Sequence, residues 1–167
     1  MLFQLVLLAA DFSGSWELAV ARSDFGAAKP PQSLVMNVKQ TEAKLAVQST
    51  LADSRGSSTS AYTLDLSGKE AENTVRGNPV VSTTAWRGPM LHVKAKTTVQ
   101  GTEIKTVDQW QLDEGGRVLT IFRTATTPKG DIEQRFVYVK SPAKHYGVYP
   151  AGIVSMLDSL RPSYMFE

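Results

Sequence analysis

The stretch Leu91-His92-Val93-Lys94-Ala95-Lys96 alternates apolar with polar residues at every step. A period of two sends successive side chains to opposite faces, which is typical of a β-strand with one buried face. Four other segments alternate in the same way, at residues 16–20, 34–38, 45–51 and 62–66. The pattern therefore predicts amphipathic strands along much of the chain.

Further strands are predicted at residues 71–76, 80–87, 102–112, 117–126 and 132–140. Turn sequences such as Gly77-Asn78-Pro79 and Gly88-Pro89 separate them, because Gly adopts positive φ and Pro cannot donate inside a ladder. Strands about 10–12 residues apart, with no long helical pattern between them, indicate an all-β, up-and-down antiparallel meander. We expect a barrel of about 8–10 strands, since closure removes exposed edges.

Composition narrows the classes of function. The chain has 167 residues, of which 42% are hydrophobic and 20% charged, as expected for one globular domain. Its net charge of +2 gives no support for a nucleic-acid partner. The absence of cysteine excludes disulfides and thiolate chemistry. With only His92 and His145 available, no multi-histidine metal site and no cofactor are predicted.

The two ends of the chain differ from the predicted barrel, which spans residues 11–140. Residues 1–10, MLFQLVLLAA, are apolar and end in small alanines, so they are interpreted either as a signal-peptide remnant or as a leading strand. They are shorter than the roughly 20 residues that span a bilayer. The signal interpretation predicts export to the periplasm or the extracellular space, with no membrane span.

Residues 141–167 are predicted to form a C-terminal extension with a short helix. Ile153, Met156, Leu157 and Leu160 have helical spacing, and Pro162 would stop the helix. The helix either packs on the barrel wall or serves as a partner-binding or dimerising tail. Residues 24–32 hold Gly26, Pro30 and Pro31, and are interpreted as a loop that either covers the barrel mouth or only connects two strands.

The segment Phe12-Ser13-Gly14-Ser15-Trp16 resembles the opening of the lipocalin superfamily, whose first strand carries Gly-x-Trp. The resemblance implies that Trp16 closes the base of the barrel next to Gly14. It also implies that an arginine late in the barrel packs over the indole through a cation–π contact. Arg135 is the matching candidate, with Arg123, one strand earlier, as the alternative.

The match extends to a loose group of bacterial lipocalin-like proteins of unassigned function. It rests on Trp86, on Trp110-Gln111-Leu112 followed by Gly116 and Leu119-Thr120, and on residues 127–130 and 137–140. The lipocalin disulfide and the second lipocalin sequence block have no counterpart here. The inward Arg-x-Tyr of fatty-acid-binding proteins is also missing, because Arg135 and Tyr138 are three residues apart and face opposite sides of a strand.

Polar residues on strands predicted to face a barrel interior suggest a binding site. Asp108 is the candidate buried carboxylate, and Arg123 or Arg135 is its candidate partner or an anion clamp. Whether the face with Val118 and Phe122 or the face with Leu119, Ile121 and Arg123 points inward stays open. The candidate ligand-binding residues are Tyr62, Trp86, Asp108, Trp110, Phe122, Arg123 and Tyr138.

The sequence shows no catalytic arrangement, since His92 lies on a face typical of solvent and no Ser-His-Asp order is present. The first hypothesis is therefore binding or sequestration of a small apolar or amphipathic ligand by an exported barrel. A filled barrel that acts as an envelope protein-interaction module is the alternative. A cofactor-free isomerase or cyclase, with Asp108 as the titratable group, is the third.

Overall fold

The computed structural model describes residues 9–142. They form ten strands and one 3-10 turn, η1 (Val20–Arg22). The strands are β1 (Gly14–Leu18), β2 (Ser33–Gln40), β3 (Lys44–Asp53), β4 (Gly56–Asp65), β5 (Ala71–Val75), β6 (Asn78–Arg87), β7 (Met90–Val99), β8 (Thr102–Leu112), β9 (Val118–Thr127) and β10 (Gly130–Lys140). The predicted all-β class is confirmed.

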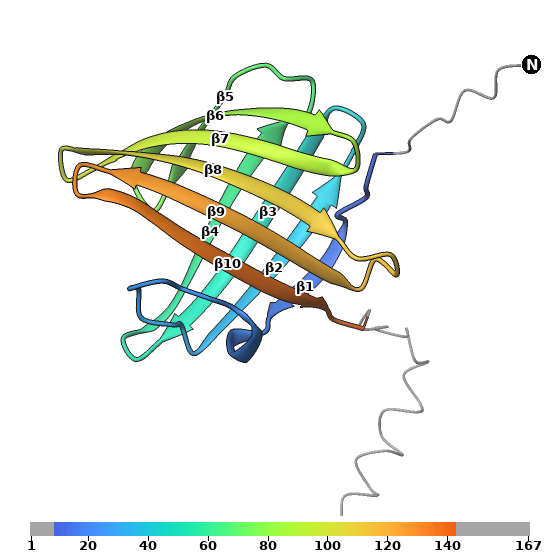
Figure 1. Cartoon of the computed structure of the whole chain (residues 1–167), viewed down its shortest axis with the longest axis horizontal. Helices are drawn as coiled ribbons and strands as arrows, with labels where there is room; N and C mark the ends of the chain where they lie inside the picture. The colour runs from blue at the N-terminus through green and yellow to red at the C-terminus, as the bar shows by residue number, and fades with distance from the viewer. Residues whose placement is uncertain (1–8, 143–167) are drawn as a thin grey trace, which may run out of the picture.

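The strands form one antiparallel sheet in the order β4-β3-β2-β1-β10-β9-β8-β7-β6-β5. Each strand pairs with its neighbour in sequence except at β4 and β5, while β1 pairs with β10 and so joins the first strand to the last. The sheet curls until β4 and β5 approach each other, as Figure 1 shows. The meander barrel is therefore confirmed, with ten strands in a nearly closed form.

Side chains partly bridge the gap between β4 and β5. The side-chain amide of Asn73 on β5 accepts a hydrogen bond from the backbone N–H of Thr63 at 2.8 Å and donates one to the Thr63 carbonyl at 2.9 Å. Farther along β4, the Thr84 hydroxyl of β6 donates to the carbonyl of Asp65. These contacts satisfy backbone groups that a missing ladder would leave unpaired.

One end of the barrel is filled with side chains. Its fully buried residues are Phe12, Trp16, Leu45, Leu91, Trp110 and Leu119. The ring of Phe12 stacks on Trp86 with centroids 6.0 Å apart and meets Trp110 edge-on at 5.6 Å. Such aromatic pairs add stability beyond their buried area. This packed end is the core of the domain, and it leaves the opposite end of the interior for a cavity.

The connection from β1 to β2 runs along that opposite end (Figure 1, dark blue). Asp24 and Arg135 exchange backbone hydrogen bonds of 2.7 and 2.8 Å, which fasten the connection to β10. The Gln134 side chain donates to the Phe25 carbonyl, and Phe25 packs edge-on against Phe136. Because Phe25 lines the cavity described below, the connection forms part of its wall.

The predicted terminal features fall on residues that the structure does not describe. The C-terminal helix at 151–160 and the tail-mediated dimer lie outside residues 9–142, as does most of the 1–10 segment. Within the described part, Ala9 and Ala10 are not in a strand, and the Gln40 side chain donates to the carbonyl of Ala10.

Candidate functional site

The interior holds a cavity of about 540 Å³ at the end opposite the packed core. Residues from β1, β2, β3, β4, β5, β8, β9, β10 and the β1–β2 connection contribute to its wall. The apolar part of the lining includes Leu18, Phe25, Leu34, Met36, Leu51 and Phe136. A smaller space of about 230 Å³ shares Tyr62, Val75, Trp110 and Arg123 with it. Cavities of this size suit a small organic molecule.

Strand alternation decides which faces point inward. On β8 the buried residues are Asp108 and Trp110, and on β10 the cavity-lining residues are Gln134, Phe136 and Tyr138. On β9, however, Leu119 and Ile121 are buried, so the face that includes Arg123 points inward and Phe122 points outward. The open question about β9 is thus answered in favour of the face that bears the arginine.

Asp108 and Arg123 form the polar centre of the interior. They are direct register partners on β8 and β9. Arg123 donates from Nε to Oδ1 and from Nη2 to Oδ2 of Asp108, both at 2.7 Å, so the pair is bidentate. The guanidinium carbon lies 5.4 Å from the ring centroid of Phe136 on β10. The hydrogen bonds to Asp108 and the contact with the Phe136 ring thus hold the Arg123 guanidinium in one orientation.

The two partners differ in exposure. The Asp108 side chain is 9% exposed, whereas the Arg123 side chain is 37% exposed. Because Arg123 lines both internal spaces, its free surface faces the cavity. Burial lowers the pKa of Arg123, but the charge and hydrogen bonds of Asp108 outweigh this effect and raise the pKa above its ordinary value. Arg123 therefore keeps its positive charge, and its exposed surface faces the cavity.

Tyr62 on β4 and Tyr138 on β10 place phenol groups near this pair. Burial raises the pKa of Tyr62 above its ordinary value, and the negative charge of Asp108 adds to the increase. Burial also raises the pKa of Tyr138 to about 12. Both hydroxyls therefore keep their protons at neutral pH and can donate or accept hydrogen bonds.

Five of the seven predicted ligand-binding residues line the internal spaces: Tyr62, Asp108, Trp110, Arg123 and Tyr138. Two do not. Trp86 stacks on Phe12 at the packed end, where aromatic packing takes its ring out of the cavity. Phe122 is 43% exposed on the outer face of β9, since it neighbours inward-facing Ile121 and Arg123.

The structure places Trp16 at the packed end, and a cation other than the predicted Arg135 lies over its indole. Trp16 is fully buried, and its Nε1 donates to the Phe12 carbonyl at 2.9 Å. Lys140, not Arg135, lies over the indole, at 5.2 Å from the centroid. Arg135 is on the outer face of β10, where its guanidinium approaches the Arg22 carbonyl. Arg135 is offset by three positions from Tyr138 and by five from Lys140, so its side chain faces the opposite side of β10.

Several lining residues were not predicted from the sequence. Phe25 and Gln134 belong to contacts between β10 and a loop more than a hundred residues earlier, which no local pattern reveals. Arg76 lines the cavity from the β5–β6 turn. Because side chains alternate along β10, Gln134 and Phe136 share a face with Tyr138.

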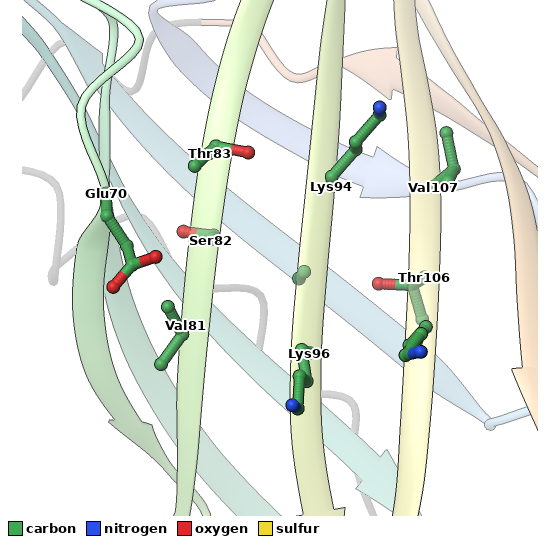
Figure 2. A pocket seen from close by; sticks show the side chains of 10 residues that line it. Glu70, Val81, Ser82, Thr83, Lys94, Lys96, Thr106 and Val107 are labelled. Atoms are coloured by element: carbon green, nitrogen blue, oxygen red, sulfur yellow. The ribbon is translucent and has the colours of Figure 1, made fainter.

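A hollow of about 430 Å³ also lies across β6, β7 and β8 (Figure 2). Lys94 and Lys96 leave β7 there in different directions, so their ammonium groups do not converge. Its lining includes Val81, Thr83 and Val107, which alternate with inward-facing neighbours along their strands. The hollow is a shallow surface between strands and lacks the converging polar groups that mark the interior.

Within residues 9–142, no group of three or more His, Cys, Asp or Glu side chains is placed to hold a metal ion. No helix in the same range is long and apolar enough to cross a membrane.

Comparisons with known proteins show the fold. The structure is similar to a secretory abundant heat soluble protein from Ramazzottius varieornatus, with a TM-score of 0.54, 12% identity, and coverage of 77% of this chain and 94% of that one. It is also similar to zebrafish ileal bile acid-binding protein complexed with cholic acid, with a TM-score of 0.53, 16% identity, and coverage of 78% and 98%. No family model and no curated protein sequence matches the chain. The likeness supports a lipocalin-like barrel fold.

Proposed function

We propose that this protein binds a small apolar or amphipathic molecule inside the barrel. The observation that carries the proposal is the 540 Å³ cavity, with apolar walls and a polar centre at Arg123. An apolar ligand is driven into such a space by removal of its surface from water. A few polar groups at a fixed place then set its orientation.

The division of the interior supports binding over a filled barrel. The packed end contains the stabilising core around Trp16, so the other end does not need to be filled with side chains for stability. A similar barrel, the zebrafish bile acid-binding protein, was solved with the amphipathic molecule cholic acid. We infer that the open end of this chain is used in a comparable way.

Nile red, a neutral dye whose fluorescence rises in apolar surroundings, provides the first test. We expect saturable binding with one site per chain. Ser60 lines the cavity, whereas Ala61, the next residue on β4, is exposed on the outer face. Ser60→Trp should fill part of the cavity and weaken binding by at least about tenfold, equivalent to about 1.4 kcal/mol.

Ala61→Trp is the matched control, because it adds the same side chain one residue away on the opposite face. It should leave the affinity for Nile red unchanged. Equal loss of binding in the two variants, or none in either, would place the dye outside the cavity. Absence of saturable binding to the natural chain would reject the proposal.

Export is part of the proposal and rests on the apolar residues 1–10. Sequencing the N-terminus of the protein recovered from a periplasmic fraction tests it. We expect a mature start close to Asp11. Recovery of the intact first ten residues from the cytoplasm alone would remove export from the proposal.

A further inference from the structure

We propose that the cavity selects an uncharged amphipathic molecule, with a hydroxyl or carbonyl head group, over a carboxylate. This inference rests on the proposed function and concerns the charge of the ligand. It follows from the hydrogen bonding of Arg123, which lines the cavity while its guanidinium is bonded to Asp108.

The charge of Arg123 is already compensated. Two of its five N–H donors bond the two oxygens of Asp108, each at 2.7 Å. The Asp108 side chain is 9% exposed, so water does little to screen its charge. To an incoming ligand, the pair therefore presents N–H donors without a net positive charge.

A ligand carboxylate at Arg123 would bring a second anion next to Asp108. Two carboxylates that share one cation disfavour simultaneous ionisation, more strongly where water is excluded. The carboxylate would also lose its hydration on entering the barrel. The site therefore disfavours an ionised acid, even though an arginine lines the cavity.

A hydroxyl or carbonyl oxygen meets neither obstacle. Three N–H groups of Arg123 remain after the bonds to Asp108. Tyr62 and Tyr138 line the same cavity, and both phenols are protonated at neutral pH. These donors can bond a neutral acceptor oxygen while the apolar part of the ligand lies along the wall that includes Leu34 and Phe136.

Among the described residues, the other cationic side chain that lines this cavity is Arg76. It is exposed in the β5–β6 turn, and it also lines an outer hollow beside Arg55. A ligand whose carboxylate binds Arg76 would keep its apolar chain in the cavity and its charged group in water. This arrangement is the competing outcome that the experiment must separate.

Displacement of Nile red by decan-1-ol and by decanoate measures the preference. In the natural protein, decan-1-ol should bind more tightly. Asp108→Asn leaves Arg123 uncompensated, so decanoate should gain at least about tenfold relative to decan-1-ol, equivalent to about 1.4 kcal/mol. Asp131→Asn changes the net charge equally at an exposed position of β10 and should leave the ratio unchanged.

A second measurement needs only the natural protein. If the site takes the acid only in its neutral form, the apparent affinity for decanoate should rise about tenfold per unit as the pH falls from about 8 to about 6. The affinity for decan-1-ol should stay constant over the same range. This result does not depend on whether Asp108→Asn folds.

Three outcomes would overturn the inference while Nile red still binds. They are tighter binding of decanoate than of decan-1-ol, decanoate affinity that does not change with pH, and loss of decanoate binding in Arg76→Gln. The last would place the carboxylate at the mouth. Failure of the natural protein to bind Nile red, decan-1-ol and decanoate would instead reject the proposed function.

Discussion

Lys140 lies over Trp16, with its ammonium nitrogen 5.2 Å from the centroid of the indole ring. The two residues are direct register partners where β10 pairs with β1. Gly14 makes room for the lysine, because a Cβ at that position would lie 2.7 Å from Lys140 Cε. The first and last strands are thus fastened by a contact that depends on a glycine two residues away.

Trp16→Ala should lower the free energy of unfolding by about 3–5 kcal/mol, as large truncations in a packed core do. The indole is fully buried and its Nε1 bonds the Phe12 carbonyl. Urea denaturation with far-ultraviolet circular dichroism provides the measurement. A loss below about 1 kcal/mol would contradict the role of Trp16 in closing the packed end.

Lys140→Met should remove the cation–π contact and lower stability by about 0.5–1 kcal/mol, since the lysine is exposed. The indole N–H resonance of Trp16 should shift in an NMR spectrum. Arg135→Met is the control, because Arg135 lies on the outer face of the same strand and should leave that resonance in place. A shift of the Trp16 resonance in Arg135→Met but not in Lys140→Met would support Arg135 as the cation over the indole, as expected from the sequence.

Asn73→Ala should weaken the junction of β4 and β5 by about 1–3 kcal/mol, because it removes two hydrogen bonds to the Thr63 backbone. Hydrogen exchange at the Thr63 amide should become faster, while exchange in the β1–β10 ladder stays slow. Asn37→Ala, at an exposed position of β2, is the control. Unchanged protection at Thr63 would show that the side-chain bridge does not hold the two strands.

Arg123→Met should lower stability by about 2–4 kcal/mol, because it leaves the Asp108 carboxylate buried without a partner. The figure is below that of a fully dry ion pair, since Arg123 faces the cavity and water screens it there. The double variant Asp108→Leu/Arg123→Met should recover part of the loss. Urea denaturation of Arg123→Met, Asp108→Leu and the double variant completes the double-mutant cycle.

Asp113 gives a dependence on pH. Backbone N–H groups of Val118 and Arg117 bond its carboxylate and hold its pKa below the ordinary value of 3.8. A lowered pKa in the folded state means that the stabilisation is complete above the ordinary value and is lost as the pH falls through the folded value. The natural protein should therefore exceed Asp113→Asn in stability at neutral pH.

The difference between the two proteins should shrink as the pH is lowered below about 3.8. Urea denaturation at a series of pH values measures it, and other carboxylates cancel in the comparison. A difference that stays constant through the acid range would mean that the Asp113 charge does not contribute to the β8–β9 turn.

The sequence predicted the strands well because alternation is clear on β7 and in four other segments, and turn sequences separate the remaining strands. It could not orient β9, since Leu119 and Ile121 on one face compete with Val118 and Phe122 on the other. The closing cation was mistaken for the same kind of reason. Choosing Lys140 over Arg135 requires the register of β10 against β1, which depends on contacts across more than 120 residues.

The site was predicted in part. Asp108 and Arg123 were both candidates, and their meeting follows from the β8–β9 register, which the turn at Asp113 sets. The contribution of Phe25 was not predictable, because the β1–β2 connection reaches the cavity only through its bonds to β10. Local periodicity identifies which residues share a face of a strand. Which residues meet across neighbouring strands depends on the register of the closed barrel.

The pairing of β1 with β10 also affects how the protein is made. During translation Trp16 leaves the ribosome long before Lys140, so β1 must wait for more than 120 residues of later chain before one of its two ladders can form. Contacts this distant in sequence slow folding of the whole domain. In a nascent chain halted after β9, the indole would lack its covering lysine, and β1 and β9 would each lack the ladder that they form with β10. The β1 and β9 strands can therefore be joined, and the barrel interior enclosed, only after β10 has been synthesised.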